Sequence, residues 1–168
     1  MKVRNIHQRT VDAPAAVVGR LFDGLASVND PLWPADRWPP MRFDRPLQVG
    51  ARGGHGLVRY DVGACEPGRS IRFDFTAPRG FDGHHRLEVV AKGEEHTVLR
   101  HVVEMNTRGP AVLSWPLVFG PLHDALLEDA LDRAERSLGL EPAGARWSAW
   151  VRFLRWVLKP RGRRSRRE

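Results

Sequence analysis

The chain of 168 residues contains one cysteine, Cys65. A single thiol excludes an internal disulfide and a zinc site made of several thiolates. No nucleophile motif surrounds Cys65, so inert packing is its simplest role. The first residues lead into a polar alternating stretch and not into an apolar run, so we expect no signal peptide. These observations favour a reducing, cytoplasmic compartment.

An excess of positive charge is also missing from most of the chain. The net charge is +7, yet residues 140–168 hold nine of the 27 basic residues and two of the 20 acidic residues, which leaves 18 of each in residues 1–139. A nucleic-acid-binding body needs a basic surface, and this body is neutral. We therefore expect no nucleic-acid partner for the body, and the excess of positive charge belongs to the tail.

Alternating apolar and polar residues predict a sheet that is exposed on one face. Residues 2–11 read as a first strand, and Asp12-Ala13-Pro14 carries the start signals of a helix. Residues 26–41 contain four prolines and two tryptophans and predict an irregular segment. Short turns separate the later alternating segments, as expected for an antiparallel meander, and these segments are residues 57–66, 70–77, 84–91 and 96–106.

The period then changes to that of a helix. Residues 121–138 place Leu127 and Leu131 on one face and acidic side chains on the other, and Gly139 is a typical C-terminal residue. The chain is thus expected to divide into an α+β body, residues 1–139, and a basic tail, residues 140–168.

Several local marks occur in a fixed order along the body. They are Asp12-Ala13-Pro14 after the first strand, Val49-Gly50-Ala51 before the meander, Glu66-Pro67-Gly68-Arg69 between strands, Gly83-His84-His85-Arg86, and Pro121-Leu122-His123-Asp124 at the last helix. In this order residues 2–139 resemble the helix-grip SRPBCC (START-like) superfamily, and within it the bacterial polyketide cyclase/dehydrase and lipid-transport group. The resemblance implies a curved antiparallel sheet wrapped around a long C-terminal helix, with an apolar cavity between them. It does not choose between carriers, receptors and enzymes.

The residues expected to face this cavity are mainly aliphatic and aromatic, as a site for an apolar ligand requires. Trp33, Trp38 and Trp115 lie in segments that should border its mouth, where they either pack in the core or cover a ligand. The expected ligand-binding residues are Tyr60, Phe73, Phe75, His85, Leu87, His101, Val103, Trp115, His123 and Leu127.

The polar members of this set are the candidates for chemistry. A buried imidazole or phenol needs a partner, so each is paired in the core, contacts a ligand, or acts as a general acid or base. His85 and His101 lie on consecutive strands and are opposite each other or one pair out of step, depending on whether the loop has five or three residues. His85, His101 and Tyr60 are thus the catalytic candidates. No metal-ligand spacing is present, and we expect neither a metal nor a cofactor.

Residues 145–159 predict an amphipathic helix that is too short to cross a bilayer. Its expected membrane-facing residues, with the arginines that follow, are Trp147, Trp150, Phe153, Leu154, Arg161, Arg163 and Arg164. An anionic membrane surface, packing on the body, a homodimer contact and nonspecific phosphate binding all remain open for the tail.

Three hypotheses follow for function. In the first, the body binds or carries a hydrophobic small molecule, a lipid or polyketide-like compound, and the tail docks it at the inner membrane face. In the second, the body is a cyclase or dehydratase that uses the cavity histidines. In the third, the cavity is closed and the tail is the interaction module.

Overall fold

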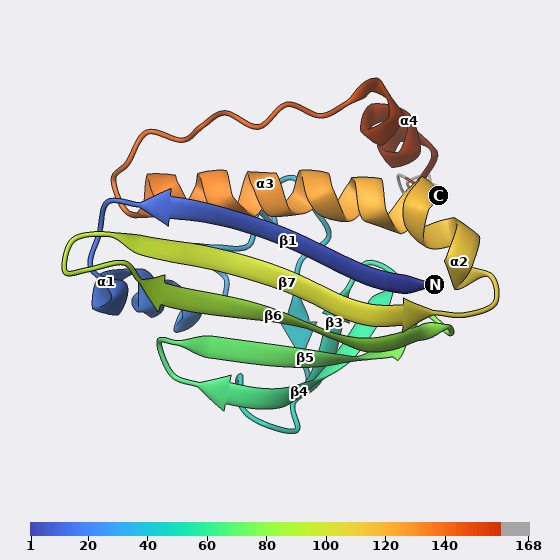
Figure 1. The fold of residues 1–168 in the computed structure, drawn as a ribbon, viewed down its shortest axis with the longest axis horizontal. Coiled ribbons are helices and arrows are strands. Elements are labelled where there is room, and N and C mark those ends of the chain that lie inside the picture. Colours follow the sequence, from blue (N-terminus) through green and yellow to red (C-terminus); the bar gives the residue numbers. More distant parts are fainter. Residues whose placement is uncertain (159–168) are drawn as a thin grey trace, which may run out of the picture.

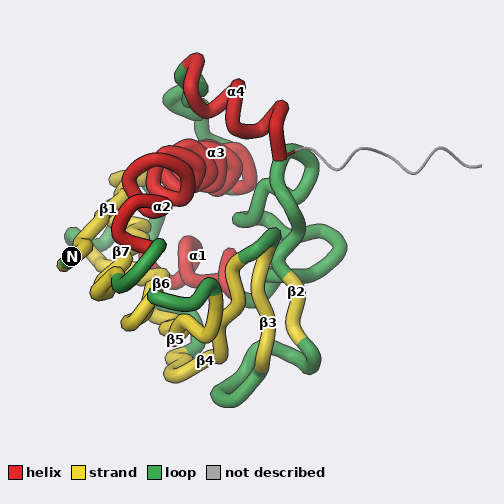
Figure 2. The backbone as a smooth tube through the Cα atoms, turned by 90° about the vertical axis from the view of Figure 1, so that its right-hand side faces the viewer, coloured by secondary structure: helices red, strands yellow, loops and turns green. Residues whose placement is uncertain are grey.

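A computed structural model describes residues 1–158; Arg161, Arg163 and Arg164 lie outside this range. Seven antiparallel strands form one curved sheet in the order β1-β7-β6-β5-β4-β3-β2. The sheet wraps around the long helix α3, which lies along its concave face (Figures 1 and 2). The strands are β1 (Lys2–Val11), β2 (Arg42–Phe43), β3 (Arg52–His55), β4 (Val58–Glu66), β5 (Ser70–Ala77), β6 (Phe81–Ala91) and β7 (Thr97–Thr107). The α+β helix-grip architecture expected from the sequence is confirmed.

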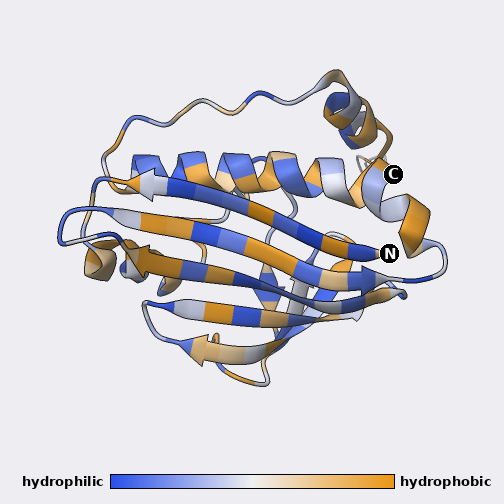
Figure 3. Ribbon diagram, in the orientation of Figure 1, coloured by the Kyte–Doolittle hydropathy of each residue, from blue (hydrophilic) through white to orange (hydrophobic). Residues whose placement is uncertain are grey.

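Hydrophobic and hydrophilic residues alternate along the strands (Figure 3), and the apolar members such as Val62, Phe73 and Leu99 are buried. One departure from the prediction lies in β4, where a bulge shifts the register between Val62 and Ala64. After the bulge Cys65 pairs with Ile71 and packs against the core. The short strands β2 and β3 were not predicted, because β2 has only two residues and the glycine-rich sequence of β3 lacks a β-sheet pattern.

The first helix is shorter than its sequence suggests. It consists of α1 (Ala15–Gly19) followed by a single 3-10 turn, η1 (Arg20–Phe22). Its N-cap residue is Pro14, and no side chain caps it. Asp12 instead accepts a hydrogen bond from His96, with Nδ1 and Oδ1 3.0 Å apart. The helix covers one end of the sheet through contacts with β6 and β7.

Two prolines shape the approach to the long helix. α2 (Ala111–Ser114) runs into a π-helical turn, η2 (Trp115–Phe119), and then into α3 (Gly120–Ser137). Proline has no N–H to donate to the carbonyl four residues earlier, so Pro116 and Pro121 interrupt the α-helical bonding pattern. The free carbonyl of Leu117 accepts a hydrogen bond from Trp150 Nε1 at 2.8 Å.

The tail is part of the packed structure as far as residue 158. Residues 140–148 run back along α3 in an extended path, and α4 (Ala149–Leu158) then lies across α3 near its N-terminal end (Figure 1). Val151 and Leu154 of α4 are buried against the body. Packing on the body, one of the alternatives left open by the sequence, therefore occurs.

Candidate functional site

A hydrogen-bonded pair of buried histidines lies at the centre of the concave face. The β6–β7 register pairs His85 with Val103 and Leu87 with His101, so the two histidines are one pair out of step. They are nevertheless diagonal neighbours, and His85 Nδ1 lies 2.9 Å from His101 Nε2. The rings of Phe73 and Phe75 stack on His85. These aromatic walls fix the orientation of the imidazole.

The pair belongs to a longer row of aromatic and imidazole rings. On one side, the ring of Tyr60 contacts that of His85, and the Tyr60 hydroxyl is 3.1 Å from His55 Nδ1. On the other side, the His123 ring centroid lies 5.0 Å from that of His101, and His7 follows at 5.6 Å from His123. Sequence reasoning missed His55, which lies in an unpredicted strand, and His7, which lies on a strand read only as polar.

Burial keeps the four inner imidazoles of this row neutral, whereas Asp124 and Glu128 raise the pKa of His7 at its end. Desolvation lowers the pKa of His55 to about 3, and it lowers the pKa values of His85, His101 and His123 as well. Desolvation raises the pKa of the Tyr60 hydroxyl, which therefore stays protonated. At neutral pH each buried imidazole thus offers one donor and one acceptor.

The outer nitrogens of the histidine pair have no partner. His85 Nε2 and His101 Nδ1 are both buried and lack a hydrogen bond. One proton occupies the bond between the two rings, on either His85 Nδ1 or His101 Nε2. In both cases one outer nitrogen carries a proton and the other carries a lone pair. The neutral pair therefore always presents one free donor and one free acceptor.

A small cavity adjoins this pair. Its volume is about 20 Å³, enough for about one water molecule. Five of the predicted ligand-binding residues line it, namely His85, His101, Phe73, Leu87 and Leu127. The other lining residues are Leu32, Trp33, Met41, Leu99, Arg100, Ala130 and Leu131.

Five predicted ligand contacts lie elsewhere in the interior. Val103 and Trp115 belong to a second apolar cluster with Phe81 and Met105, against which Phe75 packs. Tyr60 is fully buried in the main cluster, beyond the wall of the cavity. His123 touches His101 but does not line the cavity. The row of histidines runs where these two apolar clusters meet.

The irregular segment 26–41 forms one wall of the cavity through Leu32, Trp33 and Met41. Asp30 holds its start by accepting hydrogen bonds from the backbone N–H groups of Ala26, Leu32 and Trp33. Trp33 borders the cavity as predicted. Trp38 instead donates its indole N–H to Asp129 of α3 at 2.7 Å.

Asp129 is a buried carboxylate that joins three parts of the chain. Besides Trp38, it accepts hydrogen bonds from Arg37 Nη1 at 2.7 Å and from Trp147 Nε1 at 2.8 Å. Arg155 of α4 lies over the rings of Trp38 and Trp147. The carboxylate thus ties the wall of the cavity and the tail to α3.

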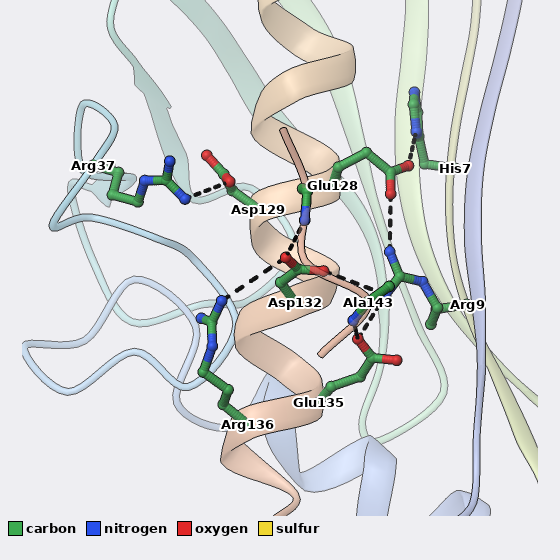
Figure 4. Close-up of polar contacts among 10 residues, drawn as sticks. His7, Arg9, Arg37, Glu128, Asp129, Asp132, Glu135, Arg136 and Ala143 are labelled. Atoms are coloured by element: carbon green, nitrogen blue, oxygen red, sulfur yellow. Dashed lines mark hydrogen bonds and ion pairs between the residues drawn. The ribbon is translucent and has the colours of Figure 1, made fainter. Parts of the chain in front are cut away.

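Glu128, Asp132 and Glu135 of α3 form ion pairs with Arg9 of β1 (Figure 4). Arg9 bonds Glu128 at 2.9 Å and Glu135 at 2.6 Å, and its Nη1 lies 3.3 Å from Asp132. His7 Nδ1 lies 2.8 Å from Glu128 Oε1. These contacts close the free edge of the sheet against α3.

The structure corrects the predicted membrane-facing set. Trp147 is bonded to Asp129, and Leu154 is buried against the body, so both face inward. Trp150 and Phe153 are half-exposed and stack on each other. Trp156, which is not in the predicted set, is 72% exposed. Within residues 1–158 no helix has both the length and the hydropathy needed to span a bilayer.

Several solved structures share the fold of this chain. CalU16 from Micromonospora echinospora is 19% identical, with a TM-score of 0.58 over 94% of this chain and 84% of that one. Norcoclaurine synthase from Thalictrum flavum, solved with dopamine and hydroxybenzaldehyde, is 17% identical, with a TM-score of 0.59 over 86% of this chain and 91% of that one. An Hsp90 activator from Plasmodium falciparum is 14% identical, with a TM-score of 0.59 over 81% and 96%.

The chain therefore has the helix-grip fold of SRPBCC and Bet v1-like proteins. No protein-family model matches the sequence, and no curated protein matches it. Proteins with this fold include one solved with small molecules bound. At these identities the likeness establishes the fold, and the function has to be inferred from the residues of the site.

Proposed function

We propose that the body binds a small, largely apolar molecule that carries a hydroxyl or carbonyl group, oriented by His85 and His101. The observation that carries this proposal is the free donor and acceptor of two histidines that line a mainly apolar cavity. A buried polar atom without a partner costs roughly 1–3 kcal/mol, and a polar ligand group removes that cost. Norcoclaurine synthase, which has the same fold, was solved with phenolic molecules bound.

Binding requires the interior to expand, because ligand pockets usually measure roughly 300–1,000 Å³. The segment 26–41 is the wall best suited to move. It is irregular, and polar contacts to Asp30, Asp129 and Arg133 hold much of it in place. The same small cavity favours the third hypothesis, in which the interior stays closed and the tail alone acts.

A matched pair of probes tests the binding proposal. The phenol p-cresol and the hydrocarbon toluene differ by one hydroxyl, and we expect roughly tenfold tighter binding of p-cresol, the equivalent of one net hydrogen bond. This preference should disappear in the double variant His85→Phe/His101→Phe, whereas His96→Ala, at an exposed histidine, should retain it. Calorimetric titration gives both affinities. Equal binding of the two probes by the native chain would refute an orienting role for the histidines.

Catalysis by the same pair is the second candidate. A neutral pair with a free donor and a free acceptor can give a proton at one end and take one at the other, as cyclisation or dehydration of a carbonyl compound requires. The double variant separates the two functions. A carrier keeps most of its affinity for the apolar part of its ligand, whereas an enzyme keeps binding and loses turnover.

For the tail, we favour docking on an anionic membrane surface. Trp150, Phe153, Trp156, Val157 and Leu158 leave an exposed apolar row on α4. Trp150 joins this row to Leu117, which lies with Leu113 on the neighbouring exposed helical turns. The sequence continues with six basic residues and one acidic residue from Lys159 to Glu168. Apolar insertion beside a basic cluster is the combination that gives reversible binding to anionic lipid.

Vesicle co-sedimentation tests this docking. Replacing Phe153 and Trp156 together by Ser should reduce binding to vesicles containing phosphatidylserine at least tenfold, because two exposed aromatic side chains no longer enter the interface. Added salt should also weaken binding of the native chain. A control variant, Val28→Ser, alters an exposed apolar residue that is distant from α4 in the sequence, and it should bind normally. Undiminished binding by the double variant would assign the α4 row to a dimer or another protein contact.

A further inference from the structure

His7, His123 and Asp124 form a compact cluster where β1 meets the start of α3. One ligand atom from each lies within 4.8 Å of the others. His7 Nε2 is 3.0 Å and His123 Nδ1 is 3.5 Å from Asp124 Oδ1. Both ring nitrogens of His123 are buried and have no hydrogen-bond partner. A buried imidazole with two free nitrogens indicates that the site takes a further group.

The spacing of these atoms matches a tetrahedral ion. Zinc binds histidine nitrogen and carboxylate oxygen at about 2.0–2.2 Å, which separates neighbouring ligand atoms by roughly 3.3 Å. The two distances to Asp124 Oδ1 lie on either side of this value. Small rotations of the three side chains would therefore suffice to place one ion between them.

The surrounding residues support the ligands in the manner found at metal sites. Glu128 Oε1 lies 2.8 Å from His7 Nδ1, the nitrogen opposite the one that faces Asp124. Such a carboxylate fixes the tautomer and the orientation of a metal-binding imidazole. Asn5 Nδ2 donates a hydrogen bond to Asp124 Oδ1 at 2.9 Å and orients that carboxylate. Half of the Asp124 side chain is exposed, so water can reach a fourth position.

From this arrangement we infer that His7, His123 and Asp124 bind one divalent transition-metal ion of the zinc class, with water as the fourth ligand. Two imidazoles and one carboxylate are ligands that this class of ion accepts. The inference departs from the expectation of no metal drawn from the sequence. That expectation looked for a short spacing motif, whereas β1 and α3 bring His7 and His123 together from distant parts of the chain.

Zinc titration of the full, tag-free chain after chelator treatment tests the site. Calorimetry and native mass spectrometry should show one Zn²⁺ per chain. Glu128→Gln should weaken binding by roughly 10–100-fold, the usual effect of removing a carboxylate that supports a ligand. His123→Ala and His7→Ala should weaken it further, and circular dichroism should show that each variant is folded. Cobalt substitution should give the intense visible absorption of a tetrahedral ion in the native chain alone.

A matched control is available in the pair His96 and Asp12, which is exposed and offers only two ligands. His96→Ala should bind Zn²⁺ like the native chain. If the native chain binds no stoichiometric ion, or if His123→Ala and Glu128→Gln bind as it does, the cluster is an ion-paired seam and not a metal site. These readouts do not depend on the cavity, so they stand apart from the p-cresol test.

Discussion

Replacing Asp129 by Ala should destabilise the protein by about 3 kcal/mol or more. The carboxylate is buried and accepts hydrogen bonds from Arg37, Trp38 and Trp147. Removing one partner of a buried charged network leaves the others unpaired, at a cost of roughly 3–5 kcal/mol. Urea unfolding followed by circular dichroism measures the loss.

Two further variants serve as controls for that stability measurement. Asp129→Asn keeps the size of the side chain and one acceptor oxygen, so it should cost less than Ala, about 1–3 kcal/mol. Asp61→Ala removes an exposed carboxylate whose nearest basic group, Arg52, lies 4.0 Å away, and it should change stability by less than about 0.5 kcal/mol. A cost for Asp129→Ala no larger than that of Asp61→Ala would mean that the buried network contributes nothing net.

The same variant should release the tail. Trp147 is anchored by Asp129, and the backbone N–H of Ala145 is bonded to Asp132 at 2.7 Å. Limited proteolysis should therefore cut residues 140–148 faster in Asp129→Ala than in the native chain. The boundary expected at residue 139 is a boundary of composition, and residues 140–158 pack on the body. Removal of residues 159–168 alone is thus the appropriate truncation for testing the basic end.

The sheet and the long helix were predictable because their apolar periods are regular. Tyr60 and Val62 in β4, like Ile71 and Phe73 in β5, repeat with the period of a strand, and Leu127 and Leu131 repeat with that of a helix. The strand β2 is too short to show a period, and β3 was not predictable because Gly53 and Gly54 supply no side chains to define a face. His55 was missed for the same reason, although it contacts Tyr60.

The histidine pair was predicted as a choice of two registers, and the five-residue loop between Ala91 and Thr97 selects one of them. The role of Asp129 could not be read from the sequence, because a carboxylate on a helix is usually solvated. Its burial depends on Trp38, which precedes α3 in the sequence, and on Trp147, which follows it. Hydrophobic periodicity identifies the elements, but it does not report polar contacts between elements distant in sequence.

Acid should unfold this protein more steeply than its carboxylates alone require. His85 and His55 have pKa values below the ordinary value, in each case first because of desolvation. Below about pH 6.5 the unfolded chain binds protons at these residues, whereas the folded chain does not. The unfolding free energy should therefore fall by about 1.4 kcal/mol per pH unit for each such imidazole, and the loss at His55 should continue to about pH 3.

The sign and the origin of this dependence can be checked together. Above about pH 6.5 both states carry neutral imidazoles, so stability should be flat with respect to these two groups. In His85→Phe the slope between about pH 6.5 and 4.5 should decrease by close to one proton, and Phe keeps an aromatic ring between Phe73 and Phe75. His96→Ala alters an exposed histidine and should leave the slope unchanged. An unchanged slope in His85→Phe would mean that His85 takes up its proton in the folded state, and the neutral donor–acceptor pair on which ligand orientation depends would then be wrong.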